Sequence, residues 1–340
     1  VEMSTSFSSN HNFSKGFFYV ADGTFNFYDT EKKTAYQDCY ASLNAGKTLG
    51  IGNYDSANII HSNGKFYLLV GTSTSNRDHF YIVDAKTLYY ENSAVVGANL
   101  SGLTILNEQY GLVTGDGIRR IDLKSLNNVR IKNERMLCFY NSIIYNGKVL
   151  SNDTYKDESK VKYYDVNELI AAKEGEAPAV TELDIIQKQK INFVLAKDGN
   201  VYTLESADNG CNIVKIKNDF TLEKVFANFQ PAKGPYHSSP TIGMVASETE
   251  NIIYLVSTDG AIYKYILGDS DSLKAPFIAA ESGVSITAPL QLNQQSGELY
   301  VTYTEELKDE SKIVVYSKDG KALHTVDCGE SVPSQILFNN

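Results

Sequence analysis

The sequence predicts an all-β protein, a seven-bladed β-propeller, and three observations lead to this class. A unit of apolar runs and tight turns recurs along the 340 residues. No linker rich in proline, serine or glycine divides the chain. The last apolar run supplies a strand that the first unit lacks. Together these observations favour one closed ring over two domains or an open stack.

The clearest copy of the unit spans residues 56–88, SANIIHSNGKFYLLVGTSTSNRDHFYIVDAKTL. Its apolar, β-rich runs are residues 58–60, 65–70 and 80–83, with a fourth run at 93–96. Asn63-Gly64 separates the first two runs, and this dipeptide readily takes the backbone angles of a two-residue hairpin turn. The unit therefore predicts a four-stranded antiparallel meander of the size of one propeller blade.

A polar turn ends the third strand of each copy, often with an aspartate. The first four turns fall at positions 29, 84, 122 and 165, and the next three at about 217, 268 and 317. Asp29, Asp84, Asp122 and Asp165 occupy the same place in their units, so we interpret them as turn and capping groups and not as a carboxylate cluster. Asp165 is expected to cap a short helix that Gly175 ends.

The first copy, with strands in residues 17–21 and 24–29, lacks an inner strand. Residues 334–338 resemble that missing strand, so the C-terminal strand is predicted to pair into the N-terminal blade. This closure covers both open sheet edges and completes seven blades. The polar residues 1–12 are predicted to be a flexible N-terminal tether, and residues 13–340 a single propeller domain.

Composition disfavours several classes of function. The formal net charge is −10, which argues against nucleic acid as a partner, and the apolar runs are too short for a transmembrane segment. The absence of tryptophan removes the residue that usually dominates sugar-stacking platforms and the blade-docking motif of quinoprotein dehydrogenases. The chain begins with Val, so an export signal would already have been removed.

The cysteines and histidines show no catalytic or metal-binding pattern. The cysteines are Cys39, Cys138, Cys211 and Cys328, and the histidines are His11, His61, His79, His237 and His324. The cysteines form no CxxC pair, so we expect isolated buried thiols, with a disulfide or metal site as the alternative. No histidine pair has metal-ligand spacing and no GxSxG motif occurs, so the sequence predicts no catalytic residues, metal or cofactor.

The repeats IIHSNGKFYLLV…FYIVDAKTL, LTILNEQYGLVTG…IRRIDLKSL and PLQLNQQSGELYVTY…IVVYSKDGKAL resemble the YVTN-type (YncE-like) seven-bladed propellers. More narrowly, they are similar to exported propeller lipoproteins that gut Bacteroidetes carry beside outer-membrane uptake systems. The resemblance implies non-enzymatic binding and a location at the cell surface, as an outer-membrane lipoprotein, or in the periplasm. One branch of such propellers captures cobamides for a TonB-dependent transporter, but none of that branch's ligand-contacting residues matches a position here.

Propeller geometry indicates where a ligand would bind. The loops that join one blade to the next lie on the same end of the ring as the loops that join the second and third strands of each blade. We call this end the mouth face; its longest loops are residues 41–56, 71–79, 151–159 and 228–239. The predicted ligand-binding residues in these loops are Asn53, Tyr54, Asp55, Arg77, His79, Tyr155, Tyr236 and His237. Taken singly, each residue is better explained as an ordinary loop residue; the prediction rests on the loops as a set.

The leading hypothesis is a monomeric, exported, non-enzymatic propeller that binds a small molecule, a glycan or a partner protein such as an outer-membrane transporter. The first alternative is a hydrolase or lyase that uses tyrosine, histidine and carboxylate groups at the same mouth. The second is a structural surface or adhesion module. The repeats specify blades and no chemistry, so the sequence leaves these alternatives open.

Overall fold

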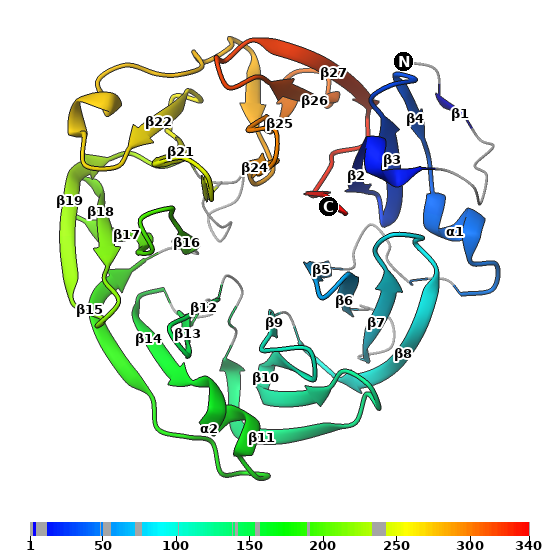
Figure 1. The fold of residues 1–340 in the computed structure, drawn as a ribbon, viewed down its shortest axis with the longest axis vertical. Coiled ribbons are helices and arrows are strands. Elements are labelled where there is room, and N and C mark those ends of the chain that lie inside the picture. The colour runs from blue at the N-terminus through cyan, green and yellow to red at the C-terminus, as the bar shows by residue number, and fades with distance from the viewer. Residues whose placement is uncertain are drawn as a thin grey trace.

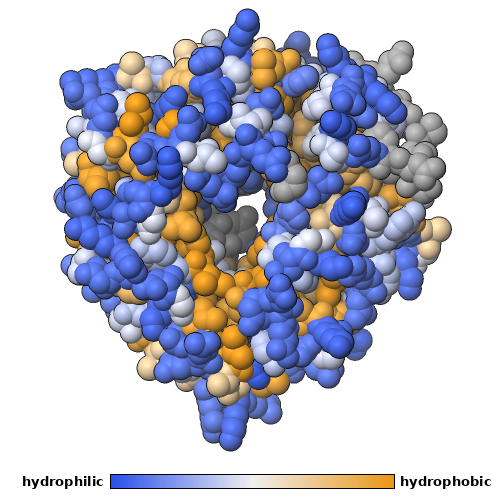
Figure 2. All heavy atoms as spheres, viewed as in Figure 1, coloured by the Kyte–Doolittle hydropathy of each residue, from blue (hydrophilic) through white to orange (hydrophobic). Residues whose placement is uncertain are grey.

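The computed structural model describes residues 3–4, 12–47, 49, 56–71, 77–100, 102–137, 139, 142–153, 157–188, 191–232 and 243–339. Their strands form seven sheets. Figure 1 shows these sheets as blades arranged in a ring, and Figure 2 shows the central opening of the ring. The predicted seven-bladed β-propeller is confirmed.

The first blade closes the ring. It contains β2 (Gly16–Ala21), β3 (Thr24–Asp29) and β4 (Thr34–Tyr36), preceded by the 3-10 helix η1 (Phe13–Lys15), and its inner strand is β28 (Gln335–Leu337). β28 runs antiparallel to β2, with Phe18 opposite Leu337 and Val20 opposite Gln335. The predicted pairing of the C-terminal strand into the N-terminal blade is therefore confirmed, and Figure 1 shows the C-terminus on the inner side of β2.

The outer edge of the same blade carries an additional short strand. β1 (Met3–Ser4) pairs in parallel with β4, with Met3 opposite Ala35 and Ser4 opposite Tyr36. These two residues belong to the stretch 1–12 that we expected to be a tether. Residues 1–2 and 5–11 of that stretch lie outside the described part of the chain.

Blades 2, 4 and 5 are four-stranded meanders. Blade 2 consists of β5 (Ser56–Ser62), β6 (Lys65–Gly71), β7 (Asp78–Asp84) and β8 (Tyr90–Gly97). Blade 4 consists of β12 (Ile143–Tyr145), β13 (Lys148–Ser151), β14 (Ser159–Asp165) and β15 (Thr181–Gln187). Blade 5 consists of β16 (Val194–Leu195), β17 (Val201–Ala207), β18 (Gly210–Ile216) and β19 (Leu222–Phe229). In each of these sheets the strands are paired in sequence order.

Blade 3 is also a four-stranded meander, but it is built from three strand segments: β9 (Gly102–Ile105), β10 (Tyr110–Asp122) and β11 (Asn128–Leu137). β10 folds back on itself near Gly117, whose φ of +84° suits glycine. The Leu123 N–H donates to the Gln109 carbonyl at 2.8 Å, so the two ends of β10 lie side by side. β10 therefore supplies both middle strands of this blade.

Blades 6 and 7 depart from the meander at their edges. Blade 6 consists of β20 (Met244–Ala246), β21 (Ile252–Val256) and β22 (Ile262–Ile266), followed by the 3-10 helix η2 (Ser270–Leu273). The outer strand of blade 6 is reduced to a bridge between Ile262 and Ile278, because Pro276 lacks an N–H. Blade 7 consists of β23 (Val284–Ile286), β24 (Gln291–Leu292), β25 (Leu299–Glu305), β26 (Ser311–Tyr316) and β27 (Ala322–Gly329).

The turns follow the sequence-based predictions. Asn63 and Gly64 have φ of +54° and +71°, as a tight hairpin turn of this type requires. The Asp122 carboxylate accepts the N–H groups of Lys124 and Ser125, both at 2.9 Å. Corresponding bonds hold the turns after Asp29 and Asp84, so the turn and capping interpretation is confirmed.

The predicted helix after blade 4's third strand is α2 (Val166–Ala171), and Asp165 caps it by accepting the Glu168 N–H at 2.9 Å. The prediction that Gly175 ends this helix is wrong. The Arg120 guanidinium ends it instead, donating to the carbonyls of Leu169 and Ala172 at 2.9 and 2.6 Å. Among the described residues a second α-helix, α1 (Cys39–Leu43), lies between blades 1 and 2 in the chain.

The core consists of a hydrophobic cluster between each pair of neighbouring blades. Between blades 1 and 2, for example, Phe18 and Phe27 pack with Phe66 and Leu68. Between blades 7 and 1, Tyr300 packs with Phe17, whose ring centroid lies 4.9 Å away. Each middle strand therefore buries both faces, one against each neighbour, which explains why runs such as FFYVA and KFYLLV are continuously apolar.

The closing strand should contribute strongly to stability. Ile336 is 2% exposed and packs in the cluster between blades 7 and 1. We expect Ile336→Ala to lower the free energy of unfolding by about 2–4 kcal/mol, because it leaves a cavity at the closure. Val332→Ala, at a position 41% exposed, is the matched control and should change it by less than about 0.5 kcal/mol. Equal effects in urea unfolding would contradict this role for β28.

The aspartate turns should make the stability of the fold depend on pH in the acidic range. The N–H groups of Ser125 and Lys124 lower the pKa of Asp122 below its ordinary value of 3.8. A lowered pKa means that the ionised carboxylate stabilises the fold above that value, and that this contribution is lost as the pH falls through the lowered pKa. Asp122→Asn should therefore lower the melting temperature at pH 7, with the difference from wild type shrinking below pH 3.8. A difference that is constant with pH would refute this.

Candidate functional site

Most of the sequence-predicted site residues lie outside the described part of the chain. These are Asn53, Tyr54, Asp55, Tyr155, Tyr236 and His237. The described members are Arg77, which is exposed just before β7, and His79, which is half-buried within β7. The structure brings His79 against Tyr81, with ring centroids 6.1 Å apart and the rings inclined by 28°. A ligand-binding role for these eight residues stays a prediction.

Asp78, between these two residues, has a structural task. It is 4% exposed and its carboxylate accepts the N–H of Leu100, in the segment that leads to blade 3. This hydrogen bond anchors the connection between two blades on the mouth face. Asp78 is therefore held within the scaffold and is not presented to a ligand.

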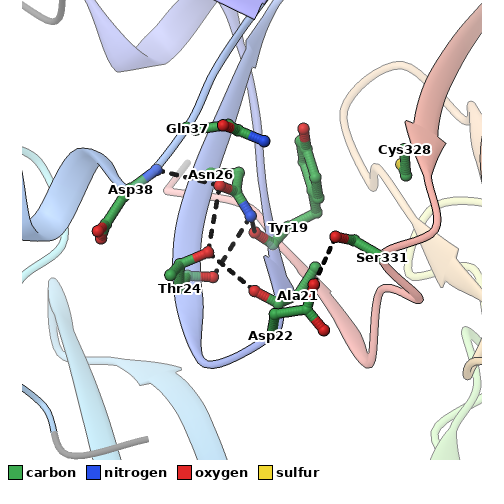
Figure 3. Close-up of a pocket in the computed structure, with 9 residues that line it drawn as sticks. All are labelled: Tyr19, Ala21, Asp22, Thr24, Asn26, Gln37, Asp38, Cys328 and Ser331. Carbon is green, nitrogen blue, oxygen red and sulfur yellow. Dashed lines mark hydrogen bonds between the residues drawn. The ribbon is translucent and has the colours of Figure 1, made fainter. Parts of the chain in front are cut away.

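A pocket of about 290 Å³ opens on the mouth face where blade 7 meets blade 1. We call it the seam pocket. It is lined by Tyr19, Ala21, Asp22, Thr24, Asn26, Gln37, Asp38, Cys328 and Ser331, drawn in Figure 3. The blade 1 wall comes from β2, β3 and the segment after β4, and the blade 7 wall comes from β27 and the segment that leads to β28. Residues from both ends of the chain therefore line the pocket.

Strand register explains how the blade 1 wall forms. Tyr19 and Asn26 are directly opposite each other on β2 and β3, so their side chains project from the same face of the blade. Tyr19 belongs to the cluster between blades 7 and 1, which identifies this face as the one toward blade 7. Aromatic side chains fill the interface between blades 7 and 1 away from the mouth face. At the mouth end, smaller polar side chains take their place.

Tyr19 is the most deeply buried polar group of the pocket. The residue is 3% exposed, and its hydroxyl makes no hydrogen bond to any described residue. Burial raises its pKa above the ordinary value of 10.0, with smaller contributions from the thiols of Cys328 and Cys39. The hydroxyl therefore stays protonated at neutral pH and can donate a hydrogen bond to an occupant of the pocket.

Asn26 fixes the shape of the pocket and is largely used by the protein itself. Its side-chain oxygen accepts the Asp38 N–H at 3.0 Å and the Thr24 hydroxyl at 3.3 Å. Its amide nitrogen donates to the carbonyls of Tyr19 and Thr24, each at 3.4 Å. Asn26 thereby ties the turn of the β2–β3 hairpin to the segment after β4, and Figure 3 shows this network as dashed lines.

Two carboxylates and an amide give the pocket its polarity. Asp22, in the tight turn between β2 and β3, accepts a hydrogen bond from the Ser331 hydroxyl across the seam. Asp38 is half-buried at the start of α1; its N–H donates to Asn26, while Figure 3 shows its carboxylate pointing away from the other lining side chains, so it acts on the pocket only through its charge. Gln37 beside it is exposed. Since no lysine or arginine lines the pocket among the described residues, its field is negative.

The Cys328 thiol in the pocket is unreactive. Burial raises the pKa of Cys328 to about 12, with a further contribution from Asp327. Cys328 is therefore a neutral thiol at physiological pH and a poor nucleophile. Cys39, Cys211 and Cys328 are all buried free thiols, while Cys138 lies outside the described residues.

A second polar feature of the mouth face links blades 4 and 5. The Gln187 amide nitrogen donates to the Thr203 hydroxyl and to the Leu204 carbonyl, both at 2.9 Å. The Gln187 oxygen accepts from the Asn152 amide, which also reaches the Ile191 carbonyl at 3.4 Å. Gln187, Thr203 and Asn152 are all almost fully buried. This uncharged network holds the two blades in register.

The network continues to blade 6 through Asn192. The Thr203 hydroxyl donates to the Asn192 carbonyl at 3.0 Å, and the Asn192 side chain bonds both the N–H and the carbonyl of Met244, at 3.0 and 2.8 Å. Within the described residues, Ser151 Oγ and Asn152 Oδ1 are buried without a hydrogen-bond partner. The oxygens of Ser151 and Asn152 are thus fixed just below the mouth face, near the interface of blades 4 and 5.

Two further observations bear on the class of site. In the part of the chain that the structure describes, no three His, Cys, Asp or Glu side chains gather closely enough to hold a metal ion. None of the helices within that part has the length and apolar character needed to cross a membrane.

Sequence reasoning missed both polar features. The pocket residues Tyr19 and Asn26 lie in strands that we read only as apolar runs, and Ser331 lies in a short connection. One signal was present: Asn26 interrupts the aromatic run TFNFYD, and a polar side chain in such a strand needs a hydrogen-bonding role. Because the closing strand was predicted, Ser331 could also have been placed beside the β2–β3 turn.

These features define a closed seven-bladed propeller with a small polar pocket at its seam. The chain matches the family model described as "Domain of unknown function (DUF5074)" over residues 13–339, and it belongs to this family. A comparison with curated proteins finds no match.

Solved structures support the fold. A quinonprotein alcohol dehydrogenase-like protein from Bacteroides thetaiotaomicron is 99% identical, with a TM-score of 0.94 over 100% of this chain and 82% of that chain. A functionally unknown protein from Desulfotomaculum acetoxidans is 12% identical, with a TM-score of 0.57 over 96% of this chain and 99% of that chain. AztD from Citrobacter koseri is 10% identical, with a TM-score of 0.51 over 94% and 96%. The last two show a shared fold alone.

The buried network should be costly to interrupt. Gln187→Leu would leave the Thr203 hydroxyl and the Asn152 amide with fewer partners in a buried site, so we expect the free energy of unfolding to fall by about 2–4 kcal/mol. Thr302→Val is the matched control, because the fully buried Thr302 hydroxyl has no partner among the described residues. That variant should be as stable as wild type or slightly more so. Equal losses in urea unfolding would contradict the assignment.

Proposed function

We propose that this DUF5074 propeller is a non-enzymatic binding protein that captures its ligand at the mouth face. The seam pocket carries the proposal. It presents hydrogen-bonding groups in fixed positions, with a neutral tyrosine at its base and two carboxylates near its rim. A concave site with a few oriented polar groups suits recognition of a small ligand.

The chemistry of the pocket supports binding over catalysis. An enzyme at this place would need a nucleophile or a general base whose pKa is moved toward neutrality. The pKa values of Tyr19 and Cys328 are raised away from neutrality, so both groups stay protonated. This arrangement favours the binding hypothesis over a hydrolase or lyase at the pocket.

The biological setting is part of the same proposal. We place the protein outside the cytoplasm, at the cell surface or in the periplasm, as a component of an outer-membrane nutrient-uptake system. Support comes from the YVTN-like repeats and from the Bacteroides protein that is 99% identical. The ligand would be a small molecule or a glycan, passed to a transporter. A cobamide is far larger than the seam pocket of about 290 Å³, so its capture would require the wider channel mouth.

A binding screen with one variant on each face tests this function. The purified chain would be titrated with neutral sugars, charged metabolites and cyanocobalamin, following the melting temperature and the heat of binding. We expect one class to raise the melting temperature with increasing concentration while mass spectrometry shows it unchanged. Gln37→Ala, at the seam pocket, should weaken that binding several-fold by removing an exposed amide.

Asn218→Ala is the matched control, because it removes an exposed amide from the opposite end of the ring. It should leave the affinity unchanged. Turnover of a compound would indicate the enzyme alternative. Absence of any bound compound or partner would favour the structural or adhesion alternative.

A further inference from the structure

The seam pocket offers donors and acceptors that the protein leaves unused. Tyr19 is a buried residue whose hydroxyl has no partner among the described residues, and Gln37 has an exposed amide. The Asp22 carboxylate accepts only the Ser331 hydroxyl among the described contacts, whereas the Asp38 carboxylate points away from the other lining side chains (Figure 3). An occupant that satisfies this set must both donate to the Asp22 carboxylate and accept from the Tyr19 hydroxyl.

Charge and hydrogen bonding together narrow the class of occupant. An anion would be repelled by Asp22 and Asp38, and no lysine or arginine of the described lining offsets that repulsion. An ammonium or guanidinium group would suit the carboxylates and could donate to the Tyr19 oxygen, but it would leave the Tyr19 O–H proton without an acceptor. An apolar molecule would leave the tyrosine hydroxyl and the carboxylates without partners.

A hydroxyl group meets both needs, because it donates one hydrogen bond and accepts others. The volume of about 290 Å³ is just below the range of about 300–1,000 Å³ of drug-sized ligand sites, so the pocket suits a smaller molecule. We propose that the seam pocket binds an uncharged, hydroxyl-rich molecule of monosaccharide size, either free or as one sugar of a longer glycan. This inference rests on the proposed binding function and specifies the ligand class for it.

Tyr19 is the residue on which discrimination depends. Because its ring is 3% exposed and packs between blades 7 and 1, Tyr19→Phe keeps the packing and removes only the hydroxyl. That hydroxyl has no partner among the described residues, so the variant should melt at the wild-type temperature or slightly above it. Any loss of affinity in this variant would then reflect the ligand and not unfolding.

The test is calorimetric titration of the wild-type chain with chosen probes. D-glucose, D-galactose and myo-inositol represent uncharged polyols, D-glucuronate represents an anion, and putrescine represents a cation without hydroxyls. We expect at least one polyol to bind, and to bind at least about ten-fold more tightly than glucuronate or putrescine. Tyr19→Phe should weaken the polyol by about five- to ten-fold.

Tyr254→Phe is the matched control, because Tyr254 is equally buried, at 3% exposed, and lies on the second strand of blade 6. It should leave polyol affinity unchanged. Preference for putrescine or glucuronate, or an unchanged affinity in Tyr19→Phe, would overturn the assignment of ligand class. Cyanocobalamin or a protein binding at the mouth with no polyol bound would overturn it too, while leaving the proposed binding function intact.

Discussion

The structure depends on the burial of both faces of every blade. Each blade packs one face against the preceding blade and the other against the following blade, so no sheet of the ring has a face free to meet water. Phe18 and Tyr19 show this at neighbouring positions, since one packs toward blade 2 and the other toward blade 7. An incomplete blade anywhere would expose two interfaces, which explains why the ring must be closed by a strand from the other end of the chain.

The same constraint decides what the sequence could predict. The ring, its blade count and its closure follow from apolar runs and turn residues, and these are local signals. Features that depend on single residues could not be predicted in this way. Pro276 reduces the outer strand of blade 6 to one bridge. Arg120, which belongs to another blade, ends α2, although Gly175 was expected to end it. The seam pocket depends on residues such as Asp22 and Ser331, which are 309 positions apart and meet only in the closed ring.

Polar groups at the mouth end complement the apolar interfaces. Apolar packing between blades is tolerant of sliding, whereas hydrogen bonds from Gln187 to Thr203 and from Asn192 to Met244 specify one relative position. Asn26 has the same effect within blade 1, where it joins the hairpin turn to the segment before α1. These hydrogen bonds restrain the described part of the mouth face, and a restrained surface loses less conformational entropy when it binds a ligand.

The closing strand also sets the order in which the pocket can be assembled. A ribosome delivers β2, β3 and β4 first, and their inner edge stays unpaired until β28 has been made. Ser331, which bonds Asp22 across the seam, emerges just before that strand. A chain interrupted during synthesis therefore lacks both the completed ring and the wall of the pocket, so ligand binding at the seam would report that the whole propeller has been built.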